Sequence, residues 1–150
     1  MEWVTNLQGK TIGLDTAPLI YFIEEHPTYL ETILNLFEAV ERGEVTAVTS
    51  TVTLLEELVH PFRSNNDDLA TEYRDILLHS KVITYDISAP IAEAAAQLRS
   101  RHNIRTPDAI QIAAAMHAGA SHFLTNDARL PAIPSIEILV LDDVIRAAKM

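Results

Sequence analysis

Four carboxylates of this chain stand at or just after segments that have the pattern of short β-strands: Asp15, Glu56, Asp108 and Asp127. Two unit charges about 6 Å apart repel by roughly 2–3 kcal/mol at an effective dielectric constant of about 20, so four crowded acids cannot all stay ionised without a cation. Oxygen ligands without cysteine suit Mg²⁺ or Mn²⁺. Such ions polarise a phosphoryl oxygen, lower the pKa of an attacking water and stabilise the leaving oxygen, which is the chemistry of phosphodiester hydrolysis.

Each acid also has a purely structural interpretation. Asp15 can act as an N-cap carboxylate, which is worth about 1 kcal/mol. In the run Thr106-Pro107-Asp108, threonine at the N-cap, proline at N1 and an acid at N2 make an ordinary helix start. Asp127 can be a turn residue. The coincidence of all four at strand ends favours a shared site, and the nearly apolar helix after Asp108 would place that carboxylate at the mouth of the core.

Two adjacent acids compete for one of these positions. At 100° per residue, Glu56 shares a helix face with Leu55 and Val59, whereas Glu57 groups with Thr53. We therefore expect Glu56 to point inward and Glu57 to face solvent. A second apolar stripe on the same helix leaves this orientation open.

The elements that must position these acids alternate between strand and helix patterns with mostly short connections. This order is typical of a parallel sheet covered on both faces, and such sheets bind ligands at the carboxyl ends of their strands. The expected fold is α/β, with three layers (α/β/α) around a central parallel sheet. The predicted strands are 11–15, 45–50, 81–87, 123–125 and 136–143, and the predicted helices are 17–25, 27–44, 51–60, 69–80, 89–102, an Ala-rich helix starting after Thr106, and a short C-terminal helix.

The length, composition and charge of the chain limit the classes of protein to which it can belong. A chain of 150 residues, 48% hydrophobic and 21% charged, is expected to form one domain, 1–150. The absence of cysteine from the sequence excludes disulfides and thiolate metal sites. No apolar run approaches about 18 residues, and the first residues lack a signal-peptide pattern, so a cytoplasmic protein without a membrane span is expected. The net charge of −10 gives a weak electrostatic case for nonspecific nucleic-acid binding.

Three motifs carry a resemblance to a known family: "LDTAPLIYFIE", "TSTVTLLEELVHP" and "RTPDAIQIAAAMHAGASHFLTND". In this order and spacing they resemble a PIN domain, and within that family the VapC-type toxin ribonucleases of bacterial toxin–antitoxin pairs. The likeness covers nearly the whole chain, and the ordered set of motifs is far more specific than any one of them.

The resemblance implies a metal-dependent endoribonuclease with Mg²⁺ or Mn²⁺ as cofactor. It also implies RNA as the substrate and a cognate antitoxin as candidate partner; a homodimer is expected as well. The family's catalytic and metal-binding acids correspond to Asp15, Glu56, Asp108 and Asp127, and Thr16, Thr125 and Asn126 fall where the family places supporting polar groups.

A local basic cluster precedes the third acid. Arg99, Arg101 and Arg105 could hold RNA phosphates at the rim of the site. They could equally be favourable basic residues near a helix C-terminus, an effect of only ~0.3–1 kcal/mol. Both interpretations stay open.

Two other functions compete with a nuclease. A catalytically silent PIN-like interaction module would keep the fold, but the intact set of four acids argues against it. A Mg²⁺-binding phosphoreceiver-like domain would need a lysine late in the site, and no lysine follows the fourth predicted strand before Lys149. Dinucleotide and P-loop motifs and a zinc-hydrolase histidine pair are missing from the sequence.

Overall fold

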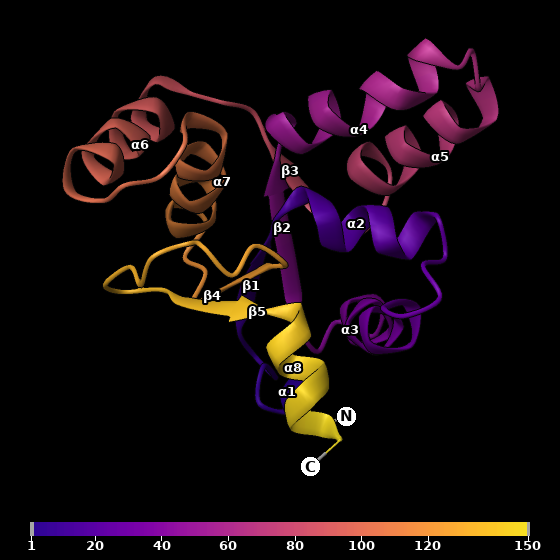
Figure 1. Ribbon diagram of the computed structural model, residues 1–150, viewed down its shortest axis with the longest axis horizontal. Coiled ribbons are helices and arrows are strands. Elements are labelled where there is room, and N and C mark those ends of the chain that lie inside the picture. The colour runs from indigo at the N-terminus through magenta and orange to yellow at the C-terminus, as the bar shows by residue number, and fades with distance from the viewer. Residues whose placement is uncertain (1, 150) are drawn as a thin grey trace.

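A five-stranded sheet lies at the centre of the structure, a computed structural model that describes residues 2–149 (Figure 1). Its strand order is β3-β2-β1-β4-β5, and all four neighbouring pairs are parallel. The chain therefore builds the sheet outward from β1 in both directions, and the order reverses between β1 and β4. The strands are β1 (Thr11–Leu14), β2 (Thr46–Ser50), β3 (Ile83–Tyr85), β4 (His122–Thr125) and β5 (Glu137–Val140).

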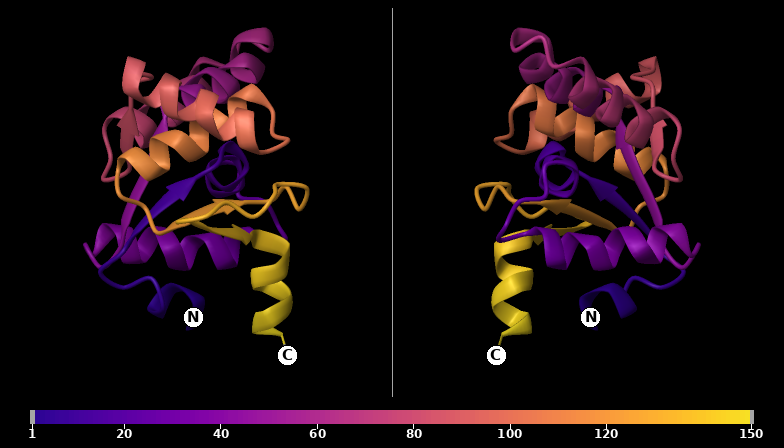
Figure 2. Two further views of the ribbon diagram at one scale, coloured as in Figure 1. Left: turned by 90° about the vertical axis from the view of Figure 1, so that its left-hand side faces the viewer. Right: turned by 90° about the vertical axis from the view of Figure 1, so that its right-hand side faces the viewer.

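Helices cover both faces of this sheet, which confirms the expected three-layer α/β/α architecture. Figure 2 shows α6 and α7 on one side of the strands and α3 and α1 on the other. The helices are α1 (Glu2–Thr5), α2 (Thr16–Ile23), α3 (Leu30–Glu41), α4 (Thr51–Arg63), α5 (Asp67–Leu78), α6 (Ala89–Arg101), α7 (Thr106–His117) and α8 (Leu141–Ala148). Within residues 2–149, none of them is long and apolar enough to cross a membrane.

Residue alternation along β1 explains the two apolar faces. Ile12 and Leu14 are buried in the core cluster that contains Leu36 of α3, as expected for side chains that alternate across a strand. Gly13 points the other way, and a Cβ at this position would overlap the Cβ of Ala115 on α7. The small residues at this contact let α7 lie directly against the central strand, which brings the start of α7 close to the end of β1.

The predicted elements are found, with differences at their ends. Helix α4 runs through Pro61 to Arg63, whereas the sequence predicted an end at His60. A proline so near the end removes only one backbone hydrogen bond, so the last turn survives. Residues 141–143, predicted as strand, begin α8. The short helix α1 was not predicted.

The start of α7 also differs by one residue. The N-cap is Arg105, whose backbone is extended, and Thr106 already lies in the helix, so Thr106 is not the N-cap. Asp108 stays in the first turn, where the partial positive charge of the helix end favours a carboxylate. Two other helices have side-chain caps: Ser88 accepts a hydrogen bond from Ile91 N at the start of α6, and Asn66 accepts one from Leu69 N at the start of α5.

Candidate active site

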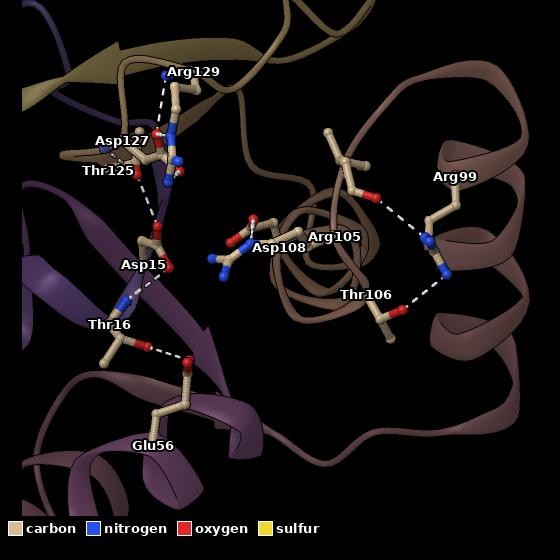
Figure 3. Close-up of polar contacts among 11 residues, drawn as sticks. Asp15, Thr16, Glu56, Arg99, Arg105, Thr106, Asp108, Thr125, Asp127 and Arg129 are labelled. Carbon is tan, nitrogen blue, oxygen red and sulfur yellow. Dashed lines mark hydrogen bonds and ion pairs between the residues drawn. The ribbon is translucent and has the colours of Figure 1, made fainter.

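The carboxyl ends of β2, β1 and β4 lie side by side, and the first candidate acid follows the middle one. Asp15 is the N-cap of α2, and its Oδ1 accepts a hydrogen bond from Thr16 N at 2.9 Å. Its Oδ2 accepts a second one, at 2.7 Å, from the hydroxyl of Thr125 at the end of β4 (Figure 3). Both carboxylate oxygens are thus held at the point where the strand order reverses, the usual ligand position in such sheets.

The charge of Asp15 is affected by two other candidate acids. Burial raises the pKa of Asp15 above its usual value, the negative charges of Asp108 and Glu56 raise it further, and the hydrogen bonds from Thr125 and Thr16 oppose these effects. The net direction is upward. These three carboxylates therefore lie near enough to repel one another across one region of the protein.

Glu56 reaches this region by a different route from the one predicted. Its Oε1 accepts a hydrogen bond from the Thr16 hydroxyl at 2.8 Å, so α4 is joined to the start of α2 (Figure 3). The face that it was expected to share with apolar residues is in fact the outer one, because Leu55 is 66% and Val59 40% exposed. The predicted inward orientation of this face was wrong.

Glu57, which was expected to face solvent, is instead buried and only 2% exposed. The inner face of α4 carries Thr53, Glu57 and Pro61. Because two of these residues are polar, the spacing of apolar residues does not identify this face as the buried one. Within residues 2–149, neither carboxylate oxygen of Glu57 has a hydrogen-bond partner. Burial, followed by the negative charges of Glu24 and Glu56, raises the pKa of Glu57 to about 9. Glu57 is therefore protonated at neutral pH.

Asp108 lies in the first turn of α7, 8% exposed, on the side of the helix that faces Asp15 (Figure 3). Its Oδ2 accepts a hydrogen bond from Arg105 Nε at 3.2 Å, which forms an ion pair at the rim. The helix N-terminus and the guanidinium group both present positive charge to this side chain.

Asp127 lies in the loop after β4 and is held by its own arginine. Arg129 donates to Oδ1 from its backbone N at 2.9 Å and from its Nε at 3.0 Å. These contacts lower the pKa of Asp127 below its usual value. The backbone N of Asp127 donates to the Thr125 hydroxyl at 3.1 Å, so Thr125 connects Asp127 with Asp15. Arg129 was not predicted from the sequence, although its position two residues after an aspartate is typical of an Asx-type turn.

The third supporting residue, Asn126, fastens two helices to the end of β4. Its Nδ2 donates to the Tyr21 hydroxyl on α2 at 3.2 Å, and its Oδ1 accepts from the backbone N of Asp142 at the start of α8 at 3.1 Å. Asn126 thus braces the loop that carries Asp127.

The donor chemistry of these acids fits a hard divalent cation, because every candidate ligand atom is an oxygen. Their present positions do not yet converge on one point. In the described part of the chain, no three histidine, cysteine, aspartate or glutamate side chains lie close enough together to hold one metal ion. Asp108 and Asp127 instead turn toward Arg105 and Arg129, whose guanidinium groups provide the compensating positive charge.

The three predicted rim arginines occupy different places. Arg99 donates from Nε to the carbonyl oxygen of Ile104 at 3.1 Å and from Nη1 to the Thr106 hydroxyl at 2.9 Å (Figure 3). These contacts pin the connection between α6 and α7. Arg105 lies at the acids, as described above, and Arg101 is exposed at the end of α6.

Sequence reasoning missed one buried polar residue beneath the acids. Gln111 on α7 is 3% exposed, and it hydrogen-bonds to Ser50 and Thr53. The available signal was a single amide in an otherwise apolar, Ala-rich helix, three residues after Asp108.

Comparisons with known proteins agree with this architecture. A family model described as PIN domain matches residues 12–136. No protein of curated function matches significantly. Among solved structures, VapBC2 from Rickettsia felis bound to promoter DNA is similar at 22% identity and a TM-score of 0.68, with 87% of this chain and 98% of that chain covered.

Two further solved structures show the same likeness. A toxin–antitoxin complex from Klebsiella pneumoniae matches at 22% identity and a TM-score of 0.65, covering 87% of this chain and 97% of that one. VapC20 from Mycobacterium tuberculosis, described as a toxin that cleaves the sarcin–ricin loop, matches at 20% identity and a TM-score of 0.64, with 79% and 91% covered. At such identities the likeness establishes a shared fold.

Proposed function

Because this chain belongs to the PIN domain family, we propose that it is a divalent-metal-dependent endoribonuclease and the toxin component of a toxin–antitoxin pair. The whole chain, 1–150, acts as a single nuclease domain. The observation that carries the proposal is the placement of Asp15. It ends the central strand, accepts a hydrogen bond from Thr125 of the neighbouring strand, and has its pKa raised in part by Asp108 and Glu56.

The proposed ligands of Mg²⁺ or Mn²⁺ are Asp15, Glu56, Asp108 and Asp127. When bound, such a cation stabilises charge on the phosphoryl oxygen and lowers the pKa of the attacking water. Thr16, Thr125 and Asn126 orient the acids: Thr125 holds Asp15, Thr16 holds Glu56, and Asn126 braces the loop of Asp127. Rigid support of this kind keeps ligand oxygens in place.

At the rim, Arg101 and Arg105 contact the phosphates of the RNA. Arg105 is suited to this role because it lies exposed beside Asp108, where a guanidinium can bind a phosphate oxygen once a cation occupies the acids. Arg99 supports RNA binding indirectly. Its hydrogen bonds to Ile104 and Thr106 hold the segment that carries Arg105 in place.

We also propose a cognate antitoxin as protein partner and a homodimer in solution. The support is indirect: the similar structures include a toxin–antitoxin complex from Klebsiella pneumoniae and a VapBC complex from Salmonella typhimurium bound to DNA. The phosphoreceiver alternative is not supported, because such domains have the strand order 2-1-3-4-5 and this sheet has β3-β2-β1-β4-β5.

Incubation of the purified chain with structured RNAs, including a sarcin–ricin stem-loop, tests the proposal. Cleavage is expected with Mg²⁺ or Mn²⁺ and is expected to stop with a chelator. Asp108→Asn should abolish it, whereas Glu93→Gln, an exposed position on α6, should cleave like wild type. Equal activity of wild type and Asp108→Asn, or cleavage that survives chelation, would contradict the assignment. No cleavage of any RNA would favour the silent interaction module.

A further inference from the structure

A buried hydrogen-bond network lies beneath the candidate acids and is centred on Gln111. This residue sits three positions after Asp108 on α7, so the two side chains share one face of the helix. Both are buried. Burying a polar side chain lowers stability unless its polar atoms form hydrogen bonds. The hydrogen-bond partners of Gln111 therefore indicate its structural role.

The amide of Gln111 joins α7 to three other elements. Its Oε1 accepts a hydrogen bond from the hydroxyl of Ser50, the last residue of β2. Its Nε2 donates to the Thr53 hydroxyl in the first turn of α4 and lies 3.5 Å from the Thr16 hydroxyl at the start of α2. One side chain therefore connects the beginnings of α2 and α4 with α7 at the carboxyl edge of the sheet.

The network continues to the end of β1. The hydroxyls of Thr53 and Thr49 are 2.9 Å apart. Thr49 donates to the carbonyl oxygen of Leu14 at 2.9 Å, directly before the Asp15 residue. Thr49, Ser50 and Thr53 are all buried, so the hydrogen bonds among them and to Gln111 are shielded from water.

Each of three candidate acids lies close in sequence to a member of this network. Asp108 is one helical turn before Gln111, and Glu56 is one turn after Thr53. Asp15 directly precedes Thr16, whose hydroxyl binds Glu56. Apolar packing alone is non-directional and would tolerate small rotations of α7 against α4. Hydrogen bonds between fixed donors and acceptors restrict these rotations.

We propose that Gln111 is a positioning residue of the candidate active site. Through Ser50, Thr53 and Thr16 it fixes the orientation of α7 relative to α4 and α2, and thereby the separation of Asp108 from Glu56 and Asp15. It does not touch the cation or the RNA itself. This inference rests on the proposed metal-dependent nuclease.

The test uses Gln111→Met, which keeps an unbranched side chain of similar length and removes both polar groups. This change leaves the hydroxyls of Ser50 and Thr53 each with one partner fewer. A second variant, Thr53→Val/Gln111→Met, therefore removes the Thr53 hydroxyl as well, so that Thr53 no longer presents an unpaired polar group. Tyr73→Phe is the matched control, since it deletes a hydroxyl that binds Glu24, which is neither a candidate acid nor a partner of Gln111. The measurements are Mn²⁺ affinity by calorimetry, the melting temperature, and kcat and KM for RNA cleavage.

Both Gln111 variants are expected to stay folded and to bind Mn²⁺ about 10- to 100-fold more weakly, with the loss of activity in kcat. Tyr73→Phe should change the melting temperature and leave Mn²⁺ affinity as in wild type. Gln111 variants that bind Mn²⁺ like wild type, and differ only in melting temperature, would overturn the positioning role and leave the nuclease proposal standing. A wild-type protein that binds no Mn²⁺ would overturn both.

Discussion

Glu56 and Glu57 are neighbours in sequence, yet their carboxylates lie in opposite environments. Glu56 is exposed and accepts a hydrogen bond from Thr16 at the candidate site. Glu57 is buried on the inner side of α4, and neither of its oxygens has a hydrogen-bond partner among the residues that the structure describes. The first is placed for a role in the site. The second keeps its proton in the folded chain, so its ionisation in the unfolded chain lowers the stability of the fold.

The pKa of Glu57 makes stability depend on pH. Its pKa is about 9 in the folded chain against the usual value of 4.5, so between these values the unfolded state ionises and the folded state stays protonated. The folded state then holds more protons, and the free energy of unfolding falls as pH rises through this window. At pH 7 the loss is roughly 3 kcal/mol at 1.36 kcal/mol per pKa unit. Glu57→Met should recover most of it and flatten the fall between pH 5 and 9.

Denaturant unfolding of wild type and Glu57→Met across this pH range measures the effect. Glu93→Met is the control, because Glu93 is exposed on α6 and should leave the pH dependence unchanged. Parallel curves for wild type and Glu57→Met would show that Glu57 ionises normally in the folded chain.

The close approach of α7 to β1 predicts a strong effect at Gly13. A Cβ there would overlap the Cβ of Ala115, so Gly13→Ala should destabilise the chain by about 1–3 kcal/mol. Ala115→Gly in the same chain makes room for the new methyl group and should restore part of this loss. Chemical denaturation of both variants checks the coupling, and purely additive effects would contradict the contact.

The rim arginines should separate into two classes. Arg105→Ala should weaken RNA binding and reduce the slope of log K against log salt by about 0.7–0.9, the loss of one phosphate contact. Arg99→Ala removes two hydrogen bonds to the α6–α7 connection and should cost about 1 kcal/mol of stability. Binding at several salt concentrations, with melting curves for both variants, distinguishes them. An unchanged slope for Arg105→Ala would leave that residue as a partner of Asp108 alone.

The ion pair of Asp127 predicts a shift in its titration. Arg129 lowers the pKa of Asp127, so Arg129→Gln should raise that pKa toward the usual value. The ionised, paired form contributes stability above the unfolded pKa and loses it as pH falls through the folded pKa, but the exposed arginine keeps this contribution small. Carboxyl-carbon NMR titration of wild type and Arg129→Gln measures the shift, and identical titration curves would argue against the pair in solution.

Much of the fold was predictable because the strands carry β-branched residues and the helices carry caps and helical spacing. The order of strands and helices sufficed for the parallel three-layer architecture. Asp15 at the end of β1 and Asp108 in the first turn of α7 were predicted from the same patterns, and the structure places both at one edge of the sheet.

The orientation of α4 was not predictable from hydrophobicity. Its inner face beside the strand ends is polar, with Thr53 and Glu57, and Leu55 points outward. Gln111 was not predicted for a related reason. Its burial depends on hydrogen bonds to residues such as Ser50, which is 61 residues away in sequence. Hydrophobic periodicity indicates only which apolar residues are buried. Thr53 and Gln111 are buried polar residues that hydrogen-bond to each other, and Glu57 is buried with a protonated carboxyl group.

The central claim, that the strand-end carboxylates share a divalent cation, is tested most directly by melting wild type, Asp15→Asn and Asp108→Asn with and without Mn²⁺. A cation bound to the folded state stabilises it by RT ln(1 + [L]/Kd), or ~2.7 kcal/mol at about one hundred times Kd. Wild type should gain stability with Mn²⁺, and both variants should gain much less. Without metal, Asp15→Asn should melt at or above wild type, because its raised pKa shows that the charge is unfavourable there. A wild-type melting temperature that Mn²⁺ leaves unchanged would contradict the shared site.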